Sequence, residues 1–156
     1  MTVKKVAVKQ YQRIVDRAAA SIGKEPFMPS EGWIATTRKA LGMSAAQLAR
    51  RLGLTRARVS QAEQAEPLGA VTLKTMRAIA EALGCRFVYA IVPAGGRVED
   101  AIAAQARRKA QALVAKASTH MALERQSLPE EKNRAEVERI ANELVRTMPA
   151  DFWDDK

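Results

Sequence analysis

Between residues 33 and 84, short apolar stretches alternate with residues that stop or start helices, and this alternation limits the possible fold more than any other feature. Glycine tolerates the left-handed conformation that ends a helix, and a Ser or Thr hydroxyl can accept a free backbone N–H where a helix begins. The expected stops are Gly42, Gly53 and Gly84, and the expected starts are Ser44, Thr55 and Thr72. We therefore predict four short helices, at about 33–41, 45–52, 56–64 and 73–83.

The rest of the chain is also mostly helical in pattern. Apolar residues at helical spacing predict a basic amphipathic helix over 3–22, and long helices at about 98–125 and 128–147 are expected to form a hairpin. Residues 86–92, with the sequence RFVYAIV, are typical of a single β-strand. The expected fold class is mainly α with one strand. The expected divisions are 1–30 (helix and linker), 31–84 (helical bundle), 85–96 (strand and turn) and 97–156 (hairpin and acidic tail).

Composition and charge agree with this fold and indicate a partner. Apolar residues make up 47% of the chain but aromatic residues only 4%, which favours close-packed helices over sheets. The net charge is +9, and the stretch from Arg38 to Ala62 contains six basic residues and no acidic one. A surface of this kind favours a polyanionic partner.

Several kinds of site are not expected. Cys85 is the only cysteine and His120 the only histidine, so we expect no disulfide, no histidine-based metal site and no catalytic triad. The longest apolar run is too short to cross a bilayer. We expect a cytoplasmic protein that is not an enzyme, with no cofactor, no metal and no membrane association.

The helices at 45–52 and 56–64 have the properties of a helix-turn-helix. Inward-facing apolar residues and a tight turn are required, and Gly53 supplies the turn. The apolar set is Leu48, Ala49, Leu52, Leu54 and Val59. The second helix would then present Arg56, Ala57 and Gln61 to the major groove, where Arg can bind guanine and Gln can bind adenine.

The stretch Ile34–Leu83 resembles the Xre, or lambda-repressor-like, family of DNA-binding domains. The resemblance is carried by Leu41-Gly42-Met43-Ser44, Leu48-Ala49, Gly53-Leu54-Thr55 and Val59-Ser60. Ala45 departs from the family, which often has a phosphate-contacting Gln there, and the contact could move to Gln47 or Arg50. The charge pattern and the resemblance together imply a set of phosphate contacts: Arg38, Lys39, Ser44, Gln47, Arg50, Arg51, Thr55, Arg58 and Ser60.

The whole chain resembles a narrower family, named mobile mystery protein A. The matching features are the domain above, the segment CRFVYAIVP, a long helix with STHMALERQ and a tail with DFWDD. Members of that family are encoded beside a Fic-domain protein, which implies a toxin–antitoxin pair. The candidate residues for binding such a partner are His120, Met121, Glu124, Phe152 and Trp153.

The expected strand at 86–92 lacks a partner, because no second good strand occurs in the sequence. Its backbone N–H and C=O groups could pair with the same strand of a second copy, giving a homodimer. The residues expected at that interface are Phe87, Val88, Tyr89 and Ile91. Alternatively, the segment packs its apolar side chains into the core of its own chain.

These patterns favour a homodimeric repressor that binds double-stranded operator DNA, such as its own promoter, and also binds a Fic-domain protein. Two alternatives stay open at this point. The protein could be a stand-alone phage-type repressor, or it could be an inhibitor of a Fic partner with a vestigial DNA-binding face.

Overall fold

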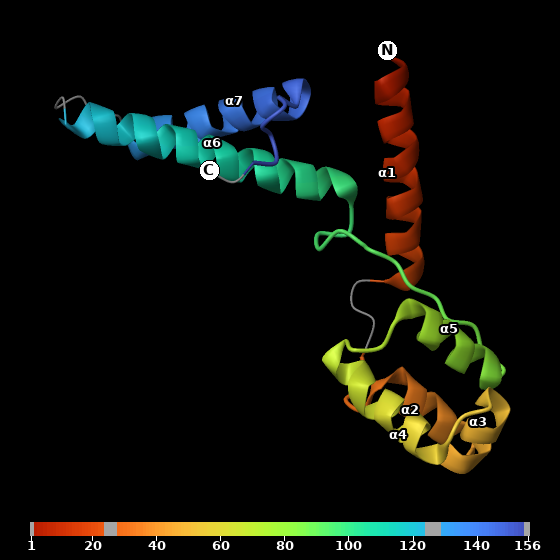
Figure 1. Ribbon diagram of the computed structural model, residues 1–156. Helices are drawn as coiled ribbons and strands as arrows, with labels where there is room; N and C mark the ends of the chain where they lie inside the picture. The colour runs from red at the N-terminus through yellow and green to blue at the C-terminus, as the bar shows by residue number, and fades with distance from the viewer. Residues whose placement is uncertain (1, 24–27, 124–128, 155–156) are drawn as a thin grey trace. The chain divides into compact units, whose positions relative to one another are not determined.

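The computed structural model describes residues 2–23, 28–123 and 129–154, and all regular secondary structure in these residues is helical (Figure 1). The chain divides into two compact units. Glu25–Tyr89 form what we call the central unit, and Met1–Lys24 with Ala90–Lys156 form the hairpin unit.

The central unit contains the four short helices that were predicted, each within one residue of the expected ends. They are α2 (Gly32–Ala40), α3 (Ala45–Leu52), α4 (Arg56–Ala65) and α5 (Leu73–Ala82). A 3-10 turn, η1 (Glu66–Leu68), follows α4 and was not predicted. The local capping signals were thus sufficient to position the α helices.

The predicted helix starts are present as hydrogen bonds. Ser44 Oγ accepts from the Gln47 N–H at 3.1 Å, and Gln47 Oε1 accepts from the Ser44 N–H at 2.7 Å. Thr55 Oγ1 accepts from the Arg58 N–H at 3.3 Å. Gly53 ends α3 in the left-handed region, with φ of 66°. Each such cap stabilises a helix by about 1 kcal/mol, so the turn between α3 and α4 is fixed on both sides.

One apolar core holds the central unit together. Its buried members come from α2, α3, α4, α5 and the residue that follows α5: Ile34, Leu48, Ala49, Val59, Ile79 and Leu83. Leu48 is fully buried, and the small Ala49 side chain lets α3 and α4 approach closely. Leu54, expected inside the turn, is instead 48% exposed.

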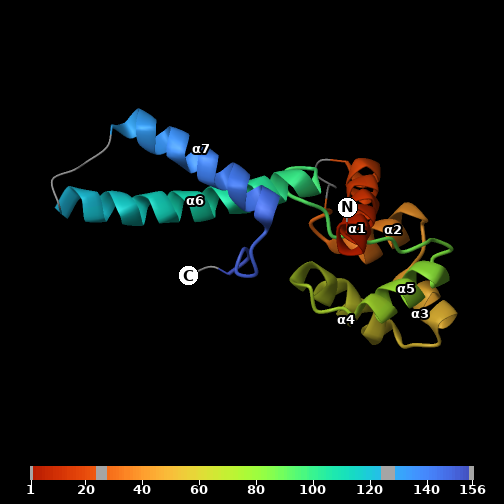
Figure 2. The ribbon, with the colours of Figure 1, turned by 90° about the horizontal axis from the view of Figure 1, so that it is seen from above.

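The hairpin unit is built on α6 (Val98–Leu123) and α7 (Glu130–Thr147), which Figures 1 and 2 both show side by side. Alanines at the seam allow close contact between the two helices. The buried set is Ala106, Ala110, Ala141 and Phe152, with Ile102, Val137, Ile140 and Leu144 packed against it. Phe152 is only 1% exposed, so its assignment as a partner-binding residue is wrong: the tail returns to the hairpin and buries this ring.

The N-terminal helix, α1 (Val3–Ile22), has the predicted bounds and packs against the start of α6. Asp16 Oδ1 accepts a hydrogen bond from the Val98 N–H at 2.8 Å, and Lys9 lies 3.6 Å from a carboxylate oxygen of Glu99. The sequence-based division separated residues 1–30 from the rest, whereas in the structure α1 belongs to the hairpin unit.

The segment 86–92 is not a β-strand, so the one-strand prediction is not supported. A strand needs a hydrogen-bonded partner, and the described residues of this chain offer no second strand. Packing into the core of the same chain does not account for the segment either, because Val88 is 70% exposed and Ile91 is 91% exposed.

Candidate nucleic-acid interface

The turn between α3 and α4 is rigid because backbone and apolar contacts fix it together. The Leu54 N–H donates to the Ala49 carbonyl at 2.9 Å, and the Gly53 N–H donates to the Arg50 carbonyl at 3.3 Å. On the inner side of α4, Val59 is 2% exposed. The side of α4 that carries Val59 is therefore held against the core, and this fixes which side chains of the helix reach solvent.

The residues predicted to contact bases, Arg56, Ala57 and Gln61, lie on the solvent-exposed part of α4. Arg56, Ala57, Arg58 and Gln61 are all exposed, whereas Ser60 is half-buried beside Val59. Neither Arg56 nor Arg58 has an ion-pair partner within the described part of the chain. Two guanidinium groups and an amide, with donors available for a ligand, thus project from the first two turns of α4.

The predicted phosphate contacts on α3 and at its start are only partly available. Ser44 and Gln47 use their side chains on each other's backbone N–H, and Thr55 caps α4. Arg51 Nε donates to the Ala82 carbonyl at 2.6 Å but stays exposed. The side chain of Arg50 is exposed and makes no hydrogen bond or ion pair within the described residues, so it is the cation of α3 most available to a ligand.

Arg38 has a structural role instead. Its guanidinium donates to both oxygens of Glu63, at 2.5 and 3.1 Å, and to the Met43 carbonyl at 2.9 Å. The side chains of Arg38 and Glu63 are only 13% and 14% exposed. The hydrogen bond to Glu63 raises the pKa of Arg38 above its ordinary value. This ion pair joins α2 to α4, and Arg38 does not belong to the exposed basic surface.

Three carboxylates of the central unit, on Glu31, Glu63 and Glu66, are engaged with other groups of the same unit. Glu31 pairs with Lys39, so the charge of Lys39, a predicted phosphate contact, is already partly neutralised. Glu63 pairs with Arg38, and the buried Glu66 accepts from the Trp33 and Ile34 N–H groups at 2.8 Å each. The role of Glu66 was not predicted from the sequence. The one local signal is Gly32 at the start of α2, since a residue this small leaves room for a close neighbour. Because these acids are engaged, the exposed face of α4 is left positive.

The hairpin unit holds the residues predicted to bind a protein partner. His120 is exposed and Met121 is half-buried, while Glu124 lies outside the described residues. Trp153 is 55% exposed and stands edge-on to Phe152, with ring centroids 5.0 Å apart. Of the five candidates, His120 and Trp153 therefore have clearly accessible side chains.

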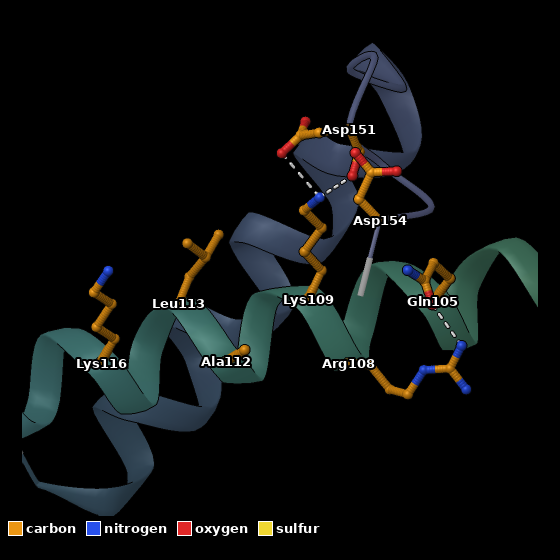
Figure 3. A pocket seen from close by; sticks show the side chains of 8 residues that line it. All are labelled: Gln105, Arg108, Lys109, Ala112, Leu113, Lys116, Asp151 and Asp154. Atoms are coloured by element: carbon orange, nitrogen blue, oxygen red, sulfur yellow. Dashed lines mark hydrogen bonds and ion pairs between the residues drawn. The ribbon is translucent and has the colours of Figure 1, made fainter. Parts of the chain in front are cut away.

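An open groove of about 540 Å³ lies between α6 and the tail (Figure 3). Lys109 lies at its centre and binds Asp151 through both the carbonyl and the carboxylate, the latter at 3.0 Å. Gln105 donates to the Phe152 carbonyl at 2.9 Å and accepts from Arg108 at 2.5 Å. These groups fasten the tail to α6, so the groove has a structural explanation.

Among the residues that the structure describes, no group of three or more His, Cys, Asp or Glu side chains is arranged to hold a metal ion. Within the same residues, no helix is long and apolar enough to cross a membrane.

Residues 34–89 match a family model described as Helix-turn-helix. The match covers the central unit from α2 onward. This part of the chain is thus similar to a helix-turn-helix domain, in agreement with the two helices and tight turn seen at α3 and α4. No match was found among curated proteins or among solved structures.

Proposed function

We propose that this protein is a sequence-specific DNA-binding transcription regulator that contacts bases through α4. The observation that carries the proposal is the set of exposed side chains on this helix: Arg56, Ala57, Arg58 and Gln61 are exposed, and neither arginine is paired with a carboxylate of the described residues. Helix α4 is packed against α3 and α2, so the backbone that carries these groups is in place before DNA binds. Only the exposed side chains then have to be ordered on binding.

The roles follow from hydrogen-bonding chemistry in the major groove. Arg56 suits a paired contact to guanine, Gln61 suits adenine, and the Ala57 methyl suits the methyl group of thymine. Arg50, Arg51 and Arg58 are positioned to bind phosphates, which fix the register of the helix on the duplex. The proposal assigns no catalytic role to the chain and needs no cofactor.

The direct test compares Arg56→Ala on specific and random DNA. The specific probe is the duplex selected by the intact protein from DNA upstream of its own gene or from a randomised pool. We expect Arg56→Ala to lose about 1–3 kcal/mol on the selected duplex and much less on random DNA. Arg77→Ala, which removes one exposed charge from α5, is the matched control. Equal losses for both variants on both probes would contradict base contact by α4.

We further propose that the regulator is a homodimeric repressor, with the 86–92 segment as its interface. Val88, Tyr89 and Ile91 are exposed although they are large and apolar. Phe87 and Tyr89 stack with ring centroids 5.7 Å apart, as alternate residues on one side of an extended chain can. Antiparallel pairing with a second copy would bury these side chains and supply two copies of α4 for successive major grooves, about 34 Å apart.

We also propose that the regulator is the antitoxin of a Fic-domain protein, because the whole chain resembles a family whose members are encoded beside one. The exposed Trp153 offers an aromatic anchor for such a partner. Co-purification with the product of the neighbouring gene, lost in Trp153→Ala, tests it. A stand-alone repressor would not co-purify, and an inhibitor with a vestigial DNA face would co-purify but fail to shift DNA.

A further inference from the structure

Four basic residues recur at every fourth position of α1: Lys5, Lys9, Arg13 and Arg17. Residues spaced by four lie on one side of an α-helix, each about 6 Å further along the axis. All four are exposed. Each step of four residues also turns by about 40° about the axis, so α1 presents a row of cations that winds gradually around the helix, which we call the basic row.

Little on the protein neutralises the basic row. Lys9 lies 3.6 Å from Glu99, but both side chains are more than half exposed, so their attraction is weak. Lys5, Arg13 and Arg17 have no ion-pair partner in the described residues. The acid of α1, Asp16, is engaged with the Val98 N–H. Three unpaired cations and one weakly paired cation on a single helix form a surface that favours a polyanionic partner.

An anionic membrane surface is the competing partner, because other side chains of α1 are apolar and exposed, among them Val3, Tyr11 and Ile14. Helices that lie in the membrane interface place Trp, Phe or Leu on the apolar side. Helix α1 contains none of these three residue types. The same chain carries a DNA-binding domain, and only nine residues separate Ile22 from Gly32. This tether raises the concentration of the basic row near any DNA that the central unit binds.

We propose that α1 is a second DNA-contacting element, which binds phosphates through Lys5, Arg13 and Arg17. This inference rests on the proposed function, since it requires that the central unit binds DNA. Contacts to phosphates carry no base information, so α1 strengthens binding to specific and random DNA alike. Its contribution falls as salt rises, because each neutralised phosphate releases a counterion.

The test measures the salt dependence of DNA affinity for the full chain. In the triple variant Lys5→Gln/Arg13→Gln/Arg17→Gln, the log–log slope should fall by about 2.7, at about 0.9 for each contact. Between about 50 and about 200 mM salt, the variant should then lose about 40-fold less affinity than the intact protein. Glutamine keeps a high helix propensity, and circular dichroism verifies that α1 persists.

Two matched variants separate contact from net charge. Lys116→Gln/Lys132→Gln/Arg134→Gln removes the same three charges from exposed positions of the hairpin and should leave the slope unchanged. Lys5→Arg/Arg13→Lys/Arg17→Lys keeps the charges and should keep the slope. Equal slope changes for the α1 and hairpin triples would overturn the inference in favour of a general charge effect.

The remaining outcomes are also decisive. The slope could be unchanged in the α1 triple variant while Arg56→Ala still weakens binding to the selected duplex more than to random DNA. This result would overturn the inference about α1 and leave the proposed function standing. Loss of binding to phosphatidylserine vesicles in the α1 triple, with an unchanged slope on DNA, assigns the basic row to a membrane surface. If the intact chain binds neither selected nor random duplex, the proposed function itself fails.

Discussion

Gly32 lies against the carboxylate of Glu66 so closely that a Cβ on this glycine would come within 2.7 Å of Glu66 Oε2. The carboxylate occupies that space because it accepts the Trp33 and Ile34 N–H groups at the start of α2. The residue that follows α4 thereby caps another helix, and Gly32 makes room for it. The positioning of α4 and the stability of α2 are therefore linked.

The first prediction concerns Gly32→Ala. Gly32 has φ of 82°, and an alanine in the left-handed region costs about 1–2 kcal/mol. Displacing the Glu66 carboxylate from two N–H groups should add about 1–3 kcal/mol to the loss in unfolding free energy, measured in urea. Gly42→Ala is the matched control, because Gly42 has φ of 65° and open space where its Cβ would be. Equal losses for the two variants would exclude the steric contact.

The second prediction is that Glu66→Gln destabilises the protein by about 1–3 kcal/mol. The amide can accept only one of the two N–H groups through its oxygen, and the other becomes a buried donor without an acceptor. The negative charge at the start of α2 is also lost. Urea unfolding measures the change, with the exposed Glu81→Gln as reference. A Glu66→Gln protein as stable as Glu81→Gln would show that the cap contributes nothing.

The third prediction separates structure from DNA contact at Arg38. Arg38→Met should lower the unfolding free energy by about 3 kcal/mol, because it leaves the mostly buried Glu63 carboxylate without its cation. At a temperature where the variant is folded, the salt slope of DNA binding should be unchanged. A slope lowered by about 0.9 would instead restore Arg38 to the phosphate contacts.

The fourth prediction concerns the proposed dimer. Val88→Pro removes a backbone N–H and fixes φ, which a paired central strand tolerates poorly. Sedimentation should show a smaller species, operator affinity should fall steeply, and helical content should survive. Val88→Thr keeps the N–H and the β-branched shape and should remain dimeric. A dimeric, folded Val88→Pro protein would move the interface to another surface.

The fifth prediction uses the exposed ion pairs of α7. The hydrogen bond from Arg139 lowers the pKa of Glu136, and that from Arg146 lowers the pKa of Glu143. A lowered pKa in the folded state stabilises it above the unfolded pKa, and this contribution is lost as pH falls through the folded pKa. In Arg139→Gln, NMR titration should show the pKa of Glu136 rising towards its ordinary value, with a smaller rise for Glu143. Equal changes at both would contradict the pairing.

The helices of the central unit were predictable because their signals are local. The Ser44–Gln47 capping box and the Thr55 cap lie within a few residues of the turns they fix. The same short range explains why the interior of the site was not predicted. Arg38 and Glu63 are 25 residues apart, and Glu63 lies just beyond the stretch without acids that suggested a phosphate contact for Arg38.

The burial of Phe152 was not predictable for a related reason. The tail turns back after Met148, which has the left-handed φ of 44° that is uncommon for a residue other than glycine. Nothing local in Met148-Pro149 indicates this conformation, which is stabilised by the ring of Phe152 in the hairpin core and by Lys109 on Asp151. The β propensity of 86–92 was a genuine local signal, but a strand also needs a partner that propensity does not supply.

The bond between Asp16 and the Val98 N–H joins residues that are 82 positions apart, with all of α2 to α5 between them. During synthesis, every residue of the central unit is made before α6. The helix-turn-helix core can therefore close on the nascent chain, because domains fold as units when their residues have emerged. Helix α1 is made first, yet it must wait for the last third of the protein before it can dock, and until then its apolar side is available to chaperones.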